Sequence, residues 1–129
     1  MSNSKAYPGC VKRAVDGVDE WINPPMLDKV EYRTTMRQNG KPVYTMFLDI
    51  GAPGVTEYAV PGITIPASAK VFRVDGNTGG LPLSQSHHAE EYIQKVVINN
   101  GATYKTVTVH STSADTAKRY IQVQLWYTK

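Results

Sequence analysis

Hydrophobic and polar positions alternate with a period of two along most of the chain after residue 26. Two segments show this most clearly, with four apolar side chains on one face of each: Tyr44, Met46, Leu48 and Ile50, then Ile121, Val123, Leu125 and Tyr127. Such a period is that of a β-strand with one buried face. In the second segment the opposite face carries Gln122, Gln124 and Trp126.

Shorter runs of the same kind recur between clear turn signals. They are rich in β-branched and aromatic residues, which favour strands, and they cover residues 31–36, 55–60, 70–74, 92–98 and 103–111. Asn100-Gly101 lies between two alternating runs, as in a β-hairpin. About seven short strands with close turns predict a mainly β fold, an antiparallel sandwich or a barrel-like module.

Residues 10–22 follow a different period. Their apolar side chains recur about every 3.6 residues and form one stripe, which consists of Cys10, Val11, Ala14, Val15, Val18, Trp21 and Ile22. The spacing predicts an N-terminal amphipathic helix that ends at Pro24-Pro25. A helix of about 13 residues is marginal alone in water, so it must pack on its own domain, a sister subunit or another protein. We therefore divide the chain into an attachment segment, 1–26, and a β-sandwich module, 27–129.

Composition narrows the class of protein. The 129 residues fit one domain, and the single Cys10 excludes an internal disulfide and multi-cysteine zinc motifs. Lys and Arg outnumber Asp and Glu by only 14 to 11, without a basic cluster, so we expect no nucleic-acid partner.

No run approaches the roughly 20 apolar residues that span a bilayer, and residues 1–8 carry no secretory signal. We expect synthesis in a cytoplasm, and we expect no insertion into a membrane.

Residues that could carry catalysis form no known motif. The chain has no P-loop, no dinucleotide-binding glycine motif and no nucleophile elbow, and Cys10 on the apolar stripe is interpreted as a small buried side chain. Within the polar stretch 84–91, His87 and Glu91 could share a divalent ion on a helix, but the four-ligand spacing of a zinc site is absent. An exposed polar loop is the favoured interpretation. We expect no enzymatic activity, no metal and no cofactor.

Six short motifs, in order along the chain, resemble the C-terminal β-rich module of bacteriophage and prophage tail-fibre and related virion proteins. The first three resemble its Y-S-T-x-E, D-G-K-P-I-Y and I-D-F-G segments, at residues 32–35, 39–44 and 49–51. The other three resemble V-A-H-G-I, L-P-L-P and a closing Y-x-x-L-E-Y-T-K, at residues 59–63, 81–83 and 120–129. The chain departs from the pattern at Asn39, Pro61 and Trp126, where the module usually has Asp, His and Glu.

The resemblance implies a β-rich virion module, often trimeric and often at a fibre end, with no catalytic residues to transfer. We accordingly expect synthesis in the host bacterial cytoplasm, a location in the virion, a homotrimer and contacts with other virion proteins. Since only residues 1–31 precede the match, our hypothesis is that the helix replaces a fibre shaft. It would attach through Val11, Val15, Val18, Trp21 and Ile22, and three copies acting together would strengthen the attachment. Removing residues 1–25 should then abolish virion incorporation and leave a folded domain.

Three functions follow from this reading. The first is a tail-fibre, receptor-binding type module that contacts a host-surface glycan or protein. The alternative is a capsid or tail decoration protein that stabilises neighbouring subunits. An enzyme that degrades envelope polysaccharide is disfavoured, because it needs paired acids across a groove, and neighbouring carboxylates such as Glu90-Glu91 seldom flank a bond.

The contact surface is predicted from the polar loops of the β region. Loops on a rigid sandwich are the usual place of recognition, and residues 84–91 and 111–118 are the most polar segments of the module. The candidate receptor or glycan contacts are His87, His88, Tyr92 and Asp115.

Overall fold

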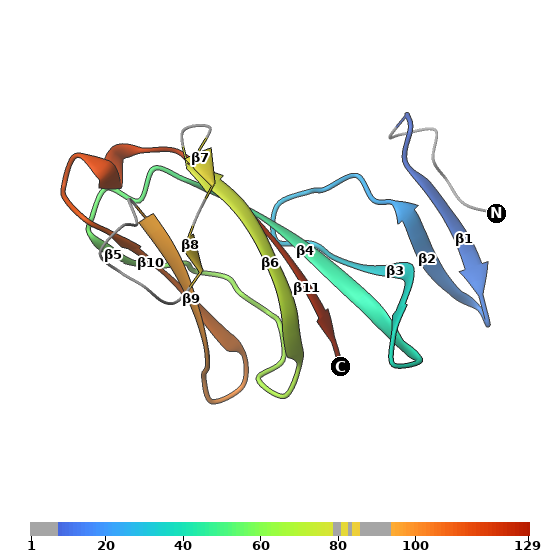
Figure 1. Ribbon diagram of the computed structural model, residues 1–129. Coiled ribbons are helices and arrows are strands. Elements are labelled where there is room, and N and C mark those ends of the chain that lie inside the picture. The colour runs from blue at the N-terminus through green and yellow to red at the C-terminus, as the bar shows by residue number, and fades with distance from the viewer. Residues whose placement is uncertain (1–7, 79–80, 83, 86–93) are drawn as a thin grey trace.

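The computed structural model describes residues 8–78, 81–82, 84–85 and 94–129 of the chain. They form two β-sheets of unequal size that pack face to face (Figure 1). This described part contains eleven strands and one 3₁₀ helix, Thr116–Lys118, and it contains no helix long and apolar enough to cross a bilayer. The prediction of a mainly β sandwich is confirmed, although the strands exceed the predicted seven; two of them have only two residues each.

The larger sheet has the strand order β1-β2-β3-β4-β11-β6-β7. Its strands are β1 (Val11–Val15), β2 (Val18–Asn23), β3 (Glu31–Gln38), β4 (Lys41–Gly51), β11 (Ile121–Thr128), β6 (Lys70–Thr78) and β7 (Leu81–Pro82). Neighbouring strands are antiparallel except β2 and β3, which pair in parallel through Trp21 and Thr34. The last strand of the chain therefore lies inside the sheet, between β4 and β6.

The smaller sheet has the order β5-β10-β9-β8. Its strands are β5 (Glu57–Ala59), β10 (Lys105–Ser111), β9 (Gln94–Asn100) and β8 (Ser84–Gln85). The hairpin predicted at Asn100-Gly101 is confirmed: it joins β9 to β10, and the Gly101 amide donates to the Tyr104 carbonyl at 2.9 Å. Since β8 pairs with β9 in parallel, as β2 does with β3 in the larger sheet, both sheets are mixed. This corrects the prediction of a purely antiparallel arrangement.

The hydrophobic core lies between the smaller sheet and the middle of the larger one. The predicted alternation of β11 is confirmed, because the four apolar side chains of its predicted inner face are buried, and Met46 and Leu48 of β4 are buried beside them. The facing residues are Val96, Val107 and Val109 from the smaller sheet and Val60, Ile63, Ile65 and Ala69 from the connection after β5. A continuous core of this kind makes the sandwich a rigid frame for its two surfaces.

The prediction of an N-terminal helix is wrong: residues 11–23 form the hairpin β1–β2. Its two-residue turn is Asp16-Gly17, with φ of 51° and 78°, and Val15 pairs with Val18 across it. Two positive φ values define the type I′ turn, for which Asp-Gly is a preferred pair because it matches the twist of the strands. Gly17 also weakens a helix, and the valines on both sides favour strands. The apparent 3.6-residue stripe arose from two short strands joined by a tight turn.

The hairpin extends the larger sheet beyond the smaller one. Figure 1 shows β1 and β2 at the far end of the molecule from the smaller sheet, and the core cluster among the described residues includes no side chain from β1, β2 or β3. A single parallel bridge joins the hairpin to β3. Side-chain contacts must therefore supply much of its attachment to the rest of the domain.

Candidate functional site

The residues predicted to form the attachment surface lie on both faces of the hairpin. Val15 pairs with Val18, and Ile22 is four residues further along β2, so these three share what we call the hairpin face. Val18 is 43% exposed and Ile22 53%. Trp21 points to the opposite face, and Val11, which is exposed, precedes a β-bulge at the start of β1. The five residues therefore do not form the single stripe expected of a helix.

A buried carboxylate anchors the hairpin to β3. Glu20 lies on the same side of β2 as the hairpin face and is fully buried. Its Oε2 accepts hydrogen bonds from Nε of Arg33 at 2.8 Å and from Nη2 of Arg37 at 2.7 Å. Burial acts to raise the pKa of Glu20, but the hydrogen bonds and charges of Arg37 and Arg33 outweigh it and hold this pKa below the ordinary value. Two guanidinium groups thus clamp the carboxylate in its charged form.

We predict that hairpin docking weakens in acid. Because the pKa of Glu20 is lower in the folded protein than its ordinary 4.5, the undocked state binds the proton more readily. The stabilisation is complete above pH 4.5 and is lost as the pH falls through the lower, folded value. Fluorescence of Trp21 in a Trp126→Phe background reports docking. In Glu20→Gln the acid-induced change in Trp21 fluorescence should be smaller than in the parent protein. An acid profile identical to that of the parent would contradict the assignment of this transition to Glu20.

Aromatic contacts hold the other face of the hairpin. Trp21 packs edge-on against Tyr32 of β3, with ring centroids 5.6 Å apart. The Lys12 ammonium lies 5.1 Å from the centre of the Trp21 ring and 2.9 Å from Asp19, across the hairpin. The Tyr32 hydroxyl accepts from the Leu27 amide at 3.2 Å, which ties β3 to the connection after β2. The Glu20 cluster therefore fixes one face of the hairpin to β3, and the contacts of Trp21 fix the other.

A second ionic cluster lies where the core meets β3. The Tyr127 hydroxyl donates to Glu31, whose other oxygen accepts from Lys129 at 2.6 Å. Tyr44 stacks on Tyr127 with ring centroids 5.9 Å apart, and the Lys129 ammonium lies 4.3 Å from the centre of the Tyr44 ring. Burial, followed by the hydrogen bond to Glu31, raises the pKa of Tyr127 far above its usual range. This hydroxyl therefore stays a hydrogen-bond donor at every physiological pH.

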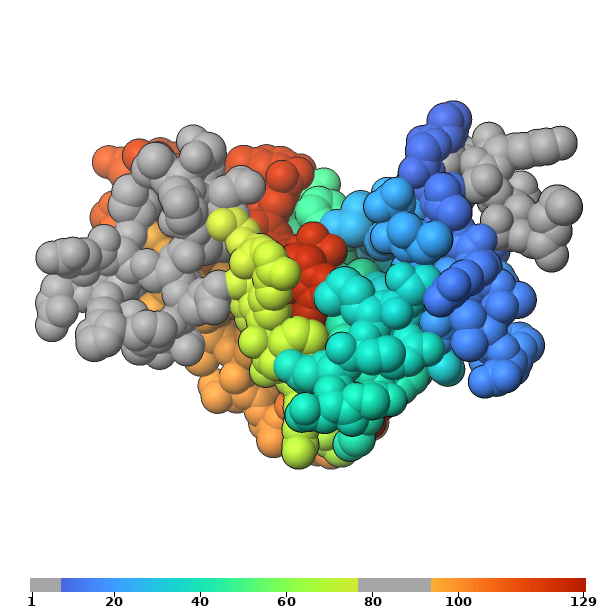
Figure 2. Space-filling model, turned by 45° about the vertical axis from the view of Figure 1, so that its right-hand side comes forward, coloured from blue at the N-terminus to red at the C-terminus, as the bar shows by residue number. Residues whose placement is uncertain are grey.

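The outer face of the larger sheet carries a pocket of about 260 Å³, here called the outer-face pocket. It is lined by Met26, Phe47, Asp75, Gly76, Gln122 and Gln124. The strand register explains this grouping, because Gln124 of β11 lies opposite Phe47 of β4 on one side and Asp75 of β6 on the other. Figure 2 shows β11 (red) at the bottom of a hollow, between β6 (yellow-green) and N-terminal segments (blue). An aromatic ring, two amides and a carboxylate thus meet in one concave site.

Hydrogen bonds hold parts of this site in place. Nε2 of Gln124 donates to Oγ1 of Thr45 at 3.0 Å, and that hydroxyl in turn donates to the Leu125 carbonyl. The guanidinium of Arg73 pairs with Asp75 at 2.9 Å and lies 4.5 Å from the centre of the Trp126 ring. The polar groups around the outer-face pocket are therefore oriented before any ligand arrives.

Two further carboxylates lie at one end of the same face. Asp49 is opposite Gln122 in the sheet, and its backbone amide donates a hydrogen bond to Oδ1 of Asp28 at 2.8 Å. The Tyr120 hydroxyl donates to the Asp49 carboxylate, and this hydrogen bond raises the pKa of Tyr120. This end of the outer face therefore carries two carboxylates, Asp28 and Asp49.

A larger groove of about 460 Å³ runs between β6 and β9. Apolar side chains of both strands line it, and its cations are Lys70, Arg73 and Lys105. The Lys105 ammonium already donates to the Ala67 carbonyl at 2.9 Å and to Asn100. Arg73 is engaged by Asp75. Two of the three cations thus have partners within the protein.

The predicted receptor contacts fall in two places. His87, His88 and Tyr92 lie outside the described residues, as does the possible metal pair His87 and Glu91. Asp115 is exposed, immediately before the 3₁₀ helix, and its carboxylate is 4.0 Å from the Lys118 ammonium. The structure does not bring Asp115 into the outer-face pocket.

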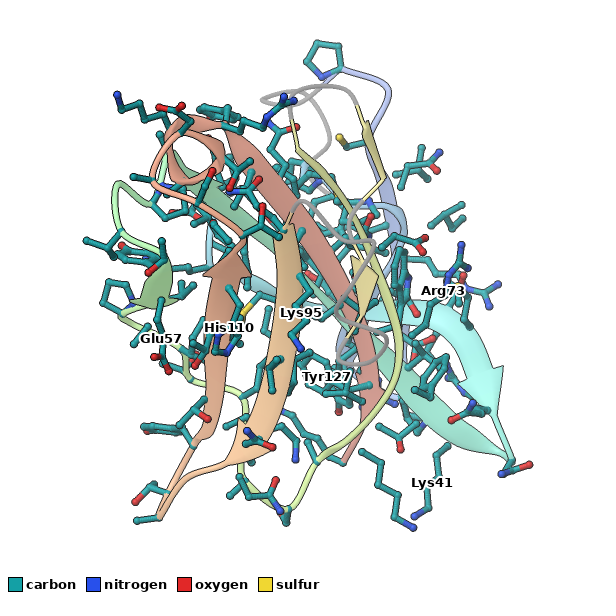
Figure 3. All side chains as sticks on the ribbon, turned by 60° about the vertical axis from the view of Figure 1, so that its left-hand side comes forward. Lys41, Glu57, Arg73, Lys95, His110 and Tyr127 are labelled. Carbon is teal, nitrogen blue, oxygen red and sulfur yellow. The ribbon has the colours of Figure 1, made fainter. Side chains whose placement is uncertain are left out.

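Two other residues with reactive or titratable side chains have clear positions. Cys10, expected to be buried on a helix, is half-buried just before β1. His110 is the penultimate residue of β10 and lies between Glu57 of β5 and Lys95 of β9 in a row across the smaller sheet (Figure 3). Among the residues with described positions, no three His, Cys, Asp or Glu side chains are grouped to hold a metal ion.

Reasoning from the sequence missed most residues of the outer-face pocket. The polar alternation of Gln122 and Gln124 was visible, but their partners Phe47 and Asp75 come from strands far away in the sequence. Glu20 was also missed, because its partners Arg33 and Arg37 are apparent only when β2 is placed beside β3. Comparison of the chain with protein-family models, with curated proteins and with solved structures returned no match. The fold and these surfaces therefore carry the functional argument.

Proposed function

We propose that this chain is a bacteriophage virion structural protein, a module of the tail-fibre, receptor-binding type. It attaches to the particle through its N-terminal hairpin and contacts the host surface with its sandwich. The observation that carries this proposal is the hairpin itself, which projects beyond the two-layered sandwich and exposes Val18 and Ile22. Exposed apolar side chains grouped at a sheet end are typical of interaction surfaces. The motif order shared with phage modules supports the same function.

The structure adds a reason why attachment and recognition would be separate. The hairpin face lies on the uncovered end of the inner face of the larger sheet, whereas the outer-face pocket lies on its opposite face. A chain held by the hairpin face therefore leaves the outer-face pocket accessible. A decoration protein would use the same hairpin, and imaging of intact particles would separate the two by location.

We predict that Val18→Ser with Ile22→Ser strongly reduces incorporation into particles of the phage or prophage that carries this sequence. Both side chains are about half exposed, so the substitutions remove apolar contact area and leave the fold intact. The measurement is the amount of chain that co-sediments with purified particles. Val55→Ser with Tyr104→Ser is the matched control, since these side chains are equally exposed and lie outside the hairpin. Particles that lack even the wild-type chain would overturn the proposed function.

A further inference from the structure

We infer that the outer-face pocket binds a single ring of an uncharged sugar. The inference rests on the proposed function, because it names the ligand through which the module would contact a host surface. The pocket volume of about 260 Å³ lies below the roughly 300–1,000 Å³ of sites for drug-sized ligands. It suits one sugar ring rather than an extended molecule.

The polar lining matches the hydrogen bonding of sugar hydroxyls. Each hydroxyl both donates and accepts, an amide side chain offers both functions, and a carboxylate accepts. Gln122 and Gln124 project from alternate positions of β11, and Asp75 stands beside Gln124 on β6. The amide nitrogen of Gln124 already donates to Thr45 and Met26, so its oxygen is the group that would accept from a sugar hydroxyl. The Gln122 amide and the Asp75 carboxylate would engage neighbouring hydroxyls of the same ring.

The apolar lining matches the other surface of a sugar. Phe47 lies on the opposite side of Gln124 from Asp75, and Met26 completes that side of the pocket. An aromatic ring packs well on a ligand that has an apolar body and polar edges. A sugar ring placed over Gln124 would have its C–H face on Phe47 and its hydroxyls toward Asp75.

The charges around the pocket favour a neutral ligand. Asp75 lines it and Asp49 lies one row away, opposite Gln122. The Arg73 cation beside Asp75 is already paired with it and stacked on Trp126. An anionic sugar would meet unfavourable charge here, because like charges repel across a shared site.

The amides of the pocket provide a direct test by NMR. The full chain is titrated with glucose, galactose and N-acetylglucosamine, and with glucuronate as the charged comparison. We expect saturable shifts of the Gln122 and Gln124 side-chain amide signals with at least one neutral sugar, and weaker binding of glucuronate. Gln124→Leu and Asp75→Ala should each weaken binding about tenfold, as loss of a ligand hydrogen bond to a charged or polar group does.

Asp19→Ala is the matched control, since it removes a carboxylate of nearly the same exposure as Asp75, 53% against 52%, that is likewise paired with a cation at 2.9 Å and lies outside the pocket. It should bind the sugar as the wild type does. The inference is overturned if no neutral sugar shifts the two amides, if glucuronate binds as tightly, or if Asp19→Ala weakens binding as much as Asp75→Ala. Failure of sugar binding with normal virion incorporation would reject the pocket and keep the proposed function. Sugar binding by a chain that is absent from purified particles would keep the pocket and reject the proposed function.

Discussion

Replacing Arg33 and Arg37 together by methionine is expected to release the hairpin from β3, at a cost of about 2 kcal/mol of docking free energy. The substitutions leave the Glu20 carboxylate without either hydrogen-bond donor, in a position where water does not reach it. Removing one side of a buried ion pair generally costs about 3–5 kcal/mol. We expect a smaller loss here because the two arginines are 25% and 36% exposed, so the carboxylate lies only one side chain below the surface.

A triple variant separates charge from shape. Adding Glu20→Leu to Arg33→Met and Arg37→Met removes the stranded charge and leaves an apolar contact of similar volume. Replacing a complete buried ion cluster by apolar residues is often neutral, so docking should return. Hydrogen exchange of the β2 amides measures the docking of the hairpin directly. If the double variant docks like the wild type, or if the triple variant docks no better than the double, the ionic anchor is refuted.

The sandwich could be predicted from the sequence because its core is encoded by local alternation. In β11 every second residue is apolar and every one of those is buried. A period of two fixes which face of a strand is buried whatever strand lies beside it. The hairpin at Asn100-Gly101 was predictable for a similar reason, since the turn is specified by two adjacent residues.

The N-terminal segment shows where the same reasoning fails. Val11, Val15, Val18 and Ile22 recur at intervals of three and four, which fits a helix as well as two strands joined by a two-residue turn. Asp16-Gly17 was the deciding signal, because a type I′ turn is a strong local determinant and a helix gains nothing from it. Turn chemistry outweighed the apparent period over these residues.

The outer-face pocket could be predicted only in part. The sequence gives the polar face of β11, but the choice of β4 and β6 as its neighbours depends on long-range pairing. The bulge between Ile121 and Gln122 also shifts the register against β4, and a shift of this kind has no local signature. Pockets on a sheet face are products of register, so they emerge only once the strands are placed.

Leu125→Ala is expected to destabilise the whole domain by about 3 kcal/mol, within the usual range for a buried leucine. Leu125 is fully buried in the central strand, between Met46 of β4 and Val74 of β6. Truncation of this side chain leaves a cavity beside both flanking strands, β4 and β6. Neither strand can move inward to fill it without breaking its hydrogen bonds to β11. Urea unfolding followed by circular dichroism gives the change in free energy.

The neighbouring residue supplies the comparison on the same strand. Gln124 faces the outer surface, and Gln124→Leu removes the hydrogen bond to Thr45 and a weak one to the sulfur of Met26, so we expect a loss of about 1 kcal/mol. Because the two positions are adjacent and point to opposite faces, the difference between them measures burial rather than strand propensity. Equal losses at both positions would mean that β11 does not separate the core from the outer-face pocket. A small loss at Gln124 also establishes that the variant used to test sugar binding is folded.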